Sequence, residues 1–284
     1  MTGDAAKTLA VTADDFGLAP EVNEAVERAH RHGILTAASL MVAEPWAADA
    51  VARARSLPGL GVGLHLTLVE GRAVLPPSRI PDLLGPDGRL RTDLARYGAA
   101  IFFRQVVKAQ VAAEIEAQFE AFAATGLPLD HVDAHKHFHL HPTVAKLLLE
   151  IGPRYGMQRL RVPVEPPDIL ARVEPVRRGL EARLAGPYAR RLRSRARRAG
   201  LEAADQVFGL AWSGAMTSAR LAGLLRHLPP GRTEVYTHPA TDGGFDGAAP
   251  GYRYAEELAA LTDPEVMEAR RLAQAEGPGT PAPR

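Results

Sequence analysis

The chain contains no cysteine, which excludes disulfides, thiolate zinc sites and thiol nucleophiles. Any metal ion must therefore be held by nitrogen and oxygen ligands. No run of about 18 apolar residues occurs, so no segment is expected to span a bilayer. Because the N-terminus also lacks an apolar leader segment, we expect no signal or transit peptide and a cytoplasmic location.

Length and charge set further limits. The 284 residues suit one α/β barrel, which commonly needs about 250 residues, so a single domain over residues 1–284 is expected. The formal net charge of +1 gives no overall attraction to nucleic acid.

Short apolar segments alternate with amphipathic ones along most of the chain. The pattern predicts strands ending at Thr12 and at 35–41, 60–66, 129–134, 159–164, 206–210 and 233–236, and helices at 20–33, 45–56, 99–124, 142–155 and 218–228. Prolines, glycines and charges interrupt it, and we expect insertions near 67–98 and 168–204. Such regular alternation favours parallel strands with helical crossovers, in an α/β barrel or a nearly closed one.

Five titratable residues fall at the ends of predicted strands: Asp14, Asp15, His65, His135 and His238. In a barrel of this kind the functional groups lie at the C-terminal ends of the strands. We therefore expect these side chains to meet on one rim.

One carboxylate and two imidazoles can hold a divalent cation and leave positions for water and a substrate carbonyl. Adjacent side chains diverge on an extended backbone, so one of Asp14 and Asp15 can ligate while the other takes a proton from the attacking water. A histidine across the pocket could protonate the leaving group. The pattern favours a metal-dependent hydrolase.

Further histidines follow the fourth predicted strand. An extended backbone would place His135, His137, His139 and His141 on one face, so not all of them can bind one ion. His135 lies nearest the strand end and is the predicted ligand, whereas His137 and His139 are predicted to contact substrate. Asp133 could orient a ligand imidazole or bond the backbone of the turn.

Two other residues are candidates for sugar binding. Arg161 lies at a predicted strand end and could contact substrate hydroxyls. Phe16 could stack on a sugar ring, although aromatic residues more often lie in the core.

Three segments together resemble the signatures of the YdjC-like carbohydrate deacetylases, a family that includes chitooligosaccharide deacetylases. They are Thr12-Ala13-Asp14-Asp15-Phe16-Gly17, Gly63-Leu64-His65 and His131-Val132-Asp133-Ala134-His135-Lys136-His137. The resemblance implies a distorted (β/α) TIM-like barrel and a Mg²⁺- or Zn²⁺-dependent removal of acetyl from an N-acetylated amino sugar.

Carried over by position, the resemblance makes Asp15, His65 and His135 the metal ligands, Asp14 the catalytic base and His238 the catalytic acid. The family's late His-Pro-Gly motif reads His238-Pro239-Ala240 here, a departure that bears on the role of His238. Within the family the chain is most similar to the branch associated with hopanoid biosynthesis, which implies an N-acetylglucosaminyl glycolipid as substrate.

Basic residues are concentrated in one segment. Arg172 to Arg198 carries ten arginines against two acids, a charge of +8, and leaves 24 basic and 31 acidic residues, or −7, elsewhere. With Leu180, Leu184, Tyr188 and Leu192 at intervals of four, the segment could lie on an anionic membrane at the inner face. A solvated helix face is the alternative. The aromatic interleaving expected for single-stranded nucleic acid is absent.

Three functions therefore stay open. The first is a metal-dependent N-deacetylase acting on a glycolipid or on soluble chitooligosaccharides. The second is a metal-dependent phosphoesterase, which normally needs two metal ions. The third is a non-catalytic protein that binds carbohydrate or membrane.

Overall fold

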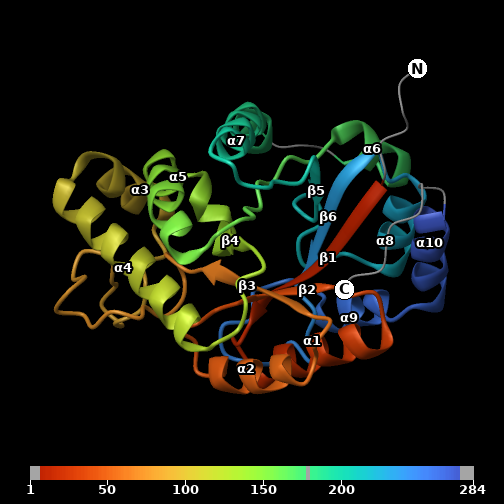
Figure 1. Cartoon of the computed structure of the whole chain (residues 1–284), viewed down its shortest axis with the longest axis horizontal. Coiled ribbons are helices and arrows are strands. Elements are labelled where there is room, and N and C mark those ends of the chain that lie inside the picture. The colour runs from red at the N-terminus through yellow and green to blue at the C-terminus, as the bar shows by residue number, and fades with distance from the viewer. Residues whose placement is uncertain (1–6, 177–179, 276–284) are drawn as a thin grey trace.

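Six parallel strands form the centre of the molecule, in the order β4-β3-β2-β1-β6-β5 (Figure 1). The structure is a computed structural model that describes residues 7–176 and 180–275. The strands are β1 (Lys7–Phe16), β2 (Ala37–Leu40), β3 (Gly61–Leu66), β4 (Val132–Ala134), β5 (Gln206–Phe208) and β6 (Gly231–Thr237). Val11, Leu64 and Val235 are fully buried in this sheet, as apolar residues of a parallel sheet covered by helices should be.

The sheet curls, and residues 159–164 bridge the gap between its two edge strands. The Arg161 N–H donates to the Val132 carbonyl at 2.9 Å on the β4 side, and the Val207 N–H donates to the Val164 carbonyl at 2.9 Å on the β5 side. The strand expected here is thus reduced to isolated bridges. The fold is nevertheless the expected distorted TIM-like barrel.

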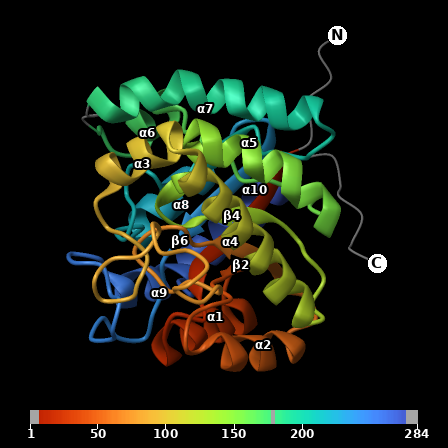
Figure 2. The same ribbon diagram turned by 90° about the vertical axis from the view of Figure 1, so that its left-hand side faces the viewer.

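Helices surround the sheet, and Figure 2 shows α3, α4 and α5 on the side opposite α8 and α10. They are α1 (Pro20–His32), α2 (Ala47–Arg55), α3 (Leu94–Phe103), α4 (Gln105–Ala124), α5 (Pro142–Ile151), α6 (Pro167–Val173), α7 (Leu180–Arg198), α8 (Ser218–Arg226), α9 (Tyr254–Leu261) and α10 (Pro264–Ala275), with 3₁₀ segments η1 (His135–Leu140) and η2 (Gly152–Tyr155). Pro20 begins α1 and Gly33 follows its end, as helix punctuation predicts.

The single helix expected at 99–124 is instead two helices. Arg104 has an extended backbone, with φ −101° and ψ 115°, and separates α3 from α4. The break lets Ile101 and Val107 both be buried, while Phe103 is 77% exposed.

The insertion after β3 is packed rather than loose. Ile80, Leu83 and Leu90 are buried, and Leu84 pairs with Leu90 in an isolated antiparallel bridge. Buried Glu114 of α4 accepts hydrogen bonds from the backbone N–H groups of residues 74 and 75 at 2.8 and 3.0 Å. The segment therefore forms a fixed wall beside the barrel mouth.

The basic segment contains α7, which is amphipathic. Ala189, Leu192 and Ala196 are buried, whereas Arg191 and Arg195 are exposed. Leu192 therefore faces the protein body and not a free apolar surface. Arg177 and Arg178 lie outside the described residues, as do the side chains of Leu180, Arg183 and Leu184. None of the helices in the described part of the chain is long and apolar enough to cross a membrane.

Candidate metal and catalytic site

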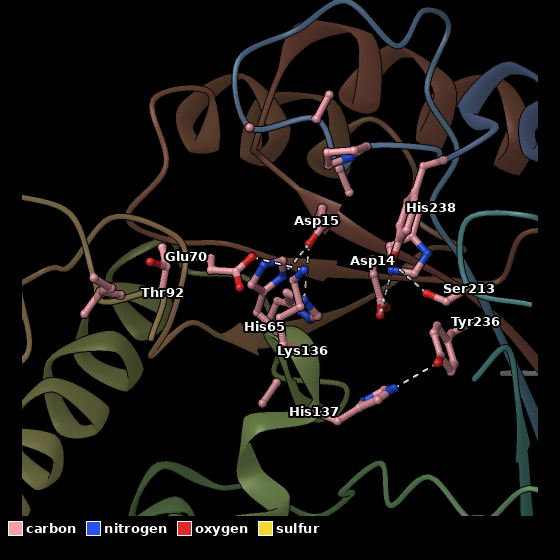
Figure 3. A pocket seen from close by; sticks show the side chains of 18 of the residues that line it. Asp14, Asp15, His65, Glu70, Thr92, Lys136, His137, Ser213, Tyr236 and His238 are labelled. Carbon is pink, nitrogen blue, oxygen red and sulfur yellow. Dashed lines mark hydrogen bonds and ion pairs between the residues drawn. The ribbon is translucent and has the colours of Figure 1, made fainter. Parts of the chain in front are cut away.

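A cavity of about 500 Å³ opens at the C-terminal ends of the strands. Its lining includes Asp14, Asp15, His65, His135, His137 and His238 from the strand ends, Glu70, Asp87, Arg89, Leu90 and Thr92 from the insertion, and Tyr236, Ser213, Tyr252 and Tyr254 (Figure 3). The five strand-end residues that the sequence pattern singled out thus line one cavity. Its volume lies in the range of small-molecule sites.

A β-bulge brings both aspartates to this cavity. Ala13 pairs with Ala38 of β2 and Phe16 with Leu40, so two residues of β1 face one residue of β2 between these pairs. Asp15 takes a left-handed conformation with φ 63° at that point. β1 is not regularly extended there, and the bulge lets both side chains line the cavity while they contact different partners, Asp14 binding Arg161 and Asp15 approaching His65 and His135.

Asp15, His65 and His135 form a compact donor group. Asp15 Oδ1 lies 3.3 Å from His65 Nε2 and 3.1 Å from His135 Nδ1. Two ligands about 2.1 Å from a tetrahedral ion lie roughly 3.4 Å apart, so these spacings suit one divalent cation. The nitrogen and oxygen donors also suit either Zn²⁺ or Mg²⁺, with only a mild preference for zinc.

Asp133 orients His65. The His65 Nδ1–H donates to Asp133 Oδ1 at 2.7 Å, which leaves Nε2 facing Asp15 and the cavity as the ring nitrogen that a metal ion would take in place of a proton. Ser39 donates to the other oxygen of Asp133 at 2.7 Å. Of the two roles open to Asp133, orienting an imidazole is therefore the one that its side chain adopts.

The electrostatics favour a cation here. Burial alone would raise the pKa of Asp15, but the charges and hydrogen bonds of His135 and His65 outweigh burial and hold it well below the usual range. Burial opposes protonation of His65, yet the carboxylates of Asp133 and Asp14 raise its pKa to about 10. The shift of His65 reflects the negative charge of the carboxylates around it, and the shift of Asp15 keeps that side chain in the anionic form that binds a cation.

Asp14 is held by a buried arginine. Arg161 Nη1 donates to Asp14 Oδ2 at 2.7 Å and lies 2.6 Å from Asp133 Oδ2, and Arg161 Nε donates to Glu234 Oε1 at 2.8 Å. Asp14 Oδ1 is buried without a hydrogen-bond partner among the described residues. One oxygen of Asp14 is thus fixed while the other is free to accept a proton.

His238 lies across from the donor group of Asp15, His65 and His135. Its Nε2 is 4.0 Å from Asp14 Oδ2, and its ring contacts Tyr252 edge-on with centroids 5.0 Å apart. The His238 backbone N–H donates to buried Glu257, which fixes the strand end. Ala240, at the position of the family's glycine, is not among the positive-φ residues, so its backbone does not require glycine.

The histidine segment is a tight turn, so the expected alternation of its side chains is wrong. Lys136 and His137 have φ of 53° and 51°, and the four histidines point to different surroundings. His137 lines the cavity and its Nε2 lies 2.9 Å from the Tyr236 hydroxyl, whereas buried His139 donates to the Arg161 carbonyl at 2.9 Å. His141 caps α5 by accepting from the Thr143 N–H.

Four non-glycine residues in the described part of the chain have positive φ: Asp15, Glu70, Lys136 and His137. All four line the cavity. Glu70 and Lys136 also form an ion pair, with 3.0 Å between Oε2 and Nζ. Such conformations cost about 1–3 kcal/mol each and cluster at functional sites, so their coincidence here marks the cavity by backbone conformation as well as by side-chain chemistry.

Three of the four predicted substrate contacts lie outside the cavity lining, buried His139 among them, and only His137 lines the cavity. Phe16 is 0% exposed and packs in the core, and Arg161 is 2% exposed and is occupied by carboxylates. Tyr236 and Tyr252 line the cavity instead. The position of Tyr236, two residues before His238 on one strand, signals a shared face, whereas nothing in the loop sequence signals Tyr252.

Comparison with known proteins agrees with this architecture. The profile of a family described as YdjC-like protein matches residues 8–271. A carbohydrate deacetylase from Geobacillus stearothermophilus is 30% identical over 260 residues, which cover 90% of each chain. One from Brevibacillus brevis is 38% identical over 159 residues, which cover 56% of this chain and only 59% of that relative. The solved structure of a proposed cellobiose-phosphate cleavage protein from Enterococcus faecalis V583 has a TM-score of 0.74 at 25% identity, covering 95% of each chain.

Proposed function

The chain belongs to the YdjC-like protein family, whose curated relatives are carbohydrate deacetylases, and we propose that it hydrolyses the acetamide of an N-acetylglucosamine-type sugar with the help of one divalent metal ion. The products would be acetate and the free amino sugar. The observation that carries the proposal is the donor group of Asp15, His65 and His135 beside an aspartate with one free oxygen, all facing one cavity.

Asp15, His65 and His135 would hold the ion. The bound ion would supply Lewis acidity, polarising the acetyl carbonyl and acidifying the attacking water. His65 presents Nε2 because Asp133 fixes its other ring nitrogen. Arg161, Asp133 and Ser39 keep these side chains in place before substrate enters, and such preorganisation favours the transition state.

Asp14 is the proposed base. Arg161 binds one of its oxygens, so the free oxygen can remove a proton from water within the cavity. His238 is the proposed acid, because its ring lines the same cavity and could protonate the departing amine. Both proton transfers are then performed by side chains that β1 and β6 place side by side in the sheet.

A phosphoesterase fits the site less well. The described residues include a second possible donor group, Asp14, His65 and Asp133, but it shares His65 with the first. Arg161 also binds both of its carboxylates. A pair of metal ions, which that chemistry normally needs, would therefore require a different arrangement of charges.

The proposed test measures acetate release from an N-acetylglucosamine conjugate with and without Zn²⁺ or Mg²⁺. Asp14→Asn should lower kcat by at least about 100-fold, since general base catalysis contributes about 10²–10⁴-fold. Asp168→Asn, in an exposed turn of α6, is the matched control and should leave kcat unchanged. Cleavage of a phosphate ester without acetate release, or full activity of Asp14→Asn, would refute the assignment.

For the substrate we propose a hopanoid glycolipid, with soluble chitooligosaccharides as the alternative. The enzyme would then work in the cytoplasm, in contact with an anionic membrane through the arginines of α7. Exposed Arg190, Arg191, Arg195 and Arg198 support this proposal. Replacing them together by glutamine should weaken association with anionic liposomes, and unchanged association would remove α7 from the proposal.

A further inference from the structure

Large apolar side chains gather at the junction of α3 and α4. Phe102, Phe103 and Val106, here named the α3–α4 elbow, are 49%, 77% and 52% exposed, and Leu94 at the other end of α3 is 40% exposed. These are four of the eight exposed large apolar residues in the described part of the chain. The two phenylalanine rings meet edge-on with centroids 5.0 Å apart, so they form one projecting surface. Clustering of this kind marks an interaction site, whereas single exposed apolar residues do not.

The elbow is surrounded by positive charge. Between Leu94 and Lys108 the chain has Arg96, Arg104 and Lys108 and no acidic residue. Arg96 and Arg104 are exposed, and Arg104 pairs with Asp82 of the insertion at 2.9 Å. An apolar projection ringed by cations is the composition of a surface that enters the headgroup layer of an anionic bilayer.

Further positive charge lies on α7, which is linked to the elbow through η1. Phe102 contacts the ring of His141, which directly follows η1, and η1 contacts α7. Figure 1 places α5 between α3 and α7. The elbow and the exposed arginines of α7 therefore lie on neighbouring elements that can meet one surface.

A second copy of the chain is a less suitable partner. In a twofold symmetric dimer the same patch meets itself, so Arg96, Arg104 and Lys108 would face their own equivalents. Like charges placed opposite one another are unfavourable, whereas each cation near an anionic lipid surface is favourable. The charge distribution thus favours lipid over self-association.

The elbow is also continuous with the cavity wall. Leu90 and Thr92 line the cavity, and Leu94 begins α3 two residues later. We propose that the α3–α4 elbow is a membrane-docking element, in which Phe102 and Phe103 enter the interface of an anionic bilayer while the surrounding cations contact lipid phosphates. Docking there would bring the cavity mouth to the bilayer surface. The inference does not depend on the proposed activity, because binding is measured without substrate.

The test is flotation with vesicles of phosphatidylcholine, with or without phosphatidylglycerol. Wild-type protein should bind the anionic vesicles, less so at high salt. Phe102→Ser/Phe103→Ser should weaken binding by at least about 10-fold, since burial of apolar surface is lost. Arg96→Gln and Lys108→Gln should each weaken it about fivefold. Met267→Ser/Leu272→Ser on α10, which are 41% and 48% exposed, is the matched control and should bind as wild type does.

A second measurement places the elbow directly. Phe103→Trp should show fluorescence quenching by bromine-labelled lipid beyond that of wild type, whose own Trp46 and Trp212 give the background. Equal binding by the double phenylalanine variant and wild type would overturn the inference. The inference would also be overturned if sedimentation showed wild type to be a dimer and the double phenylalanine variant a monomer. The elbow would then join two copies of the chain.

Discussion

Replacing Arg161 by methionine should destabilise the protein more than any exposed arginine substitution. The side chain is 0% exposed and one guanidinium faces Asp14, Asp133 and Glu234 within 2.6 to 2.8 Å. Methionine has similar length without charge, so the buried carboxylates of Asp14 and Asp133 and the partly buried carboxylate of Glu234 would lose their counterion. Breaking a buried ion pair from one side costs about 3–5 kcal/mol.

At about 2–4 °C for each kcal/mol in a protein of this size, that loss corresponds to a fall in Tm of roughly 6–20 °C. Urea unfolding of wild type and Arg161→Met would measure the loss in free energy of unfolding, and a thermal scan would measure the fall in Tm. Arg159→Met is the matched control: its side chain is 54% exposed and pairs with Asp130 and Glu202, so about 0–1 kcal/mol is expected.

Two further variants separate charge from packing. Arg161→Lys keeps the charge but loses the planar fork, so it should fall between wild type and Arg161→Met. Adding Glu234→Gln to Arg161→Met removes one unpaired carboxylate and should recover part of the loss. If Arg161→Met were as stable as Arg159→Met, the view that Arg161 holds the buried carboxylates together would be wrong.

Three other predictions follow from the site and its surroundings. Chelation should abolish acetate release and lower Tm, because an ion at about 100 times its Kd stabilises the folded state by about 2.7 kcal/mol; a chelated protein shown by elemental analysis to be metal-free yet fully active would contradict this. Gly63→Ala should cost about 1–3 kcal/mol in urea unfolding, because the new Cβ would lie 2.5 Å from the His131 ring, whereas Gly59→Ala, with 3.5 Å to His30, should cost far less. The hydrogen bond from His131 holds the pKa of Asp130 below its usual range. Burial opposes this shift, and the positive charges of His131 and Arg159 add to it. The Asp130 carboxylate therefore stabilises the folded state fully above its unfolded pKa of about 3.9, and this stabilisation is lost as the pH falls through the lower folded pKa. The difference in unfolding free energy between wild type and Asp130→Asn should narrow below about pH 4. A difference that does not depend on pH would show that the charge of Asp130 does not contribute to stability.

The placement of the site could be predicted from sequence because it depends on topology. Parallel strands with helical crossovers bring all strand ends to one rim, so Asp15, His65, His135 and His238 could be assigned to one cavity without knowing any side-chain contact. What failed depends on local backbone geometry. The bulge at Asp14 and Asp15 and the turn at Lys136 and His137 leave no periodic signal, and they decide where each side chain points.

Arg161 illustrates the second limit. From sequence it is one polar residue near a strand end, and its partners at positions 14, 133 and 234 are far away along the chain. Only closure of the barrel makes them neighbours. The break at Arg104 has a related cause. Apolar residues keep their helical spacing through it, so the sequence predicts one helix, whereas the break follows from the packing that buries both Ile101 and Val107.

The left-handed backbone of Glu70 and Lys136 has a consequence for laboratory evolution. Glycine at either position would relieve the local conformational cost, although it would also give the unfolded chain more freedom. A selection for heat resistance alone would therefore sample these two positions and could discard the ion pair that they share. Survivors of such a selection would resist heat better but would lack this ion pair in the lining of the cavity.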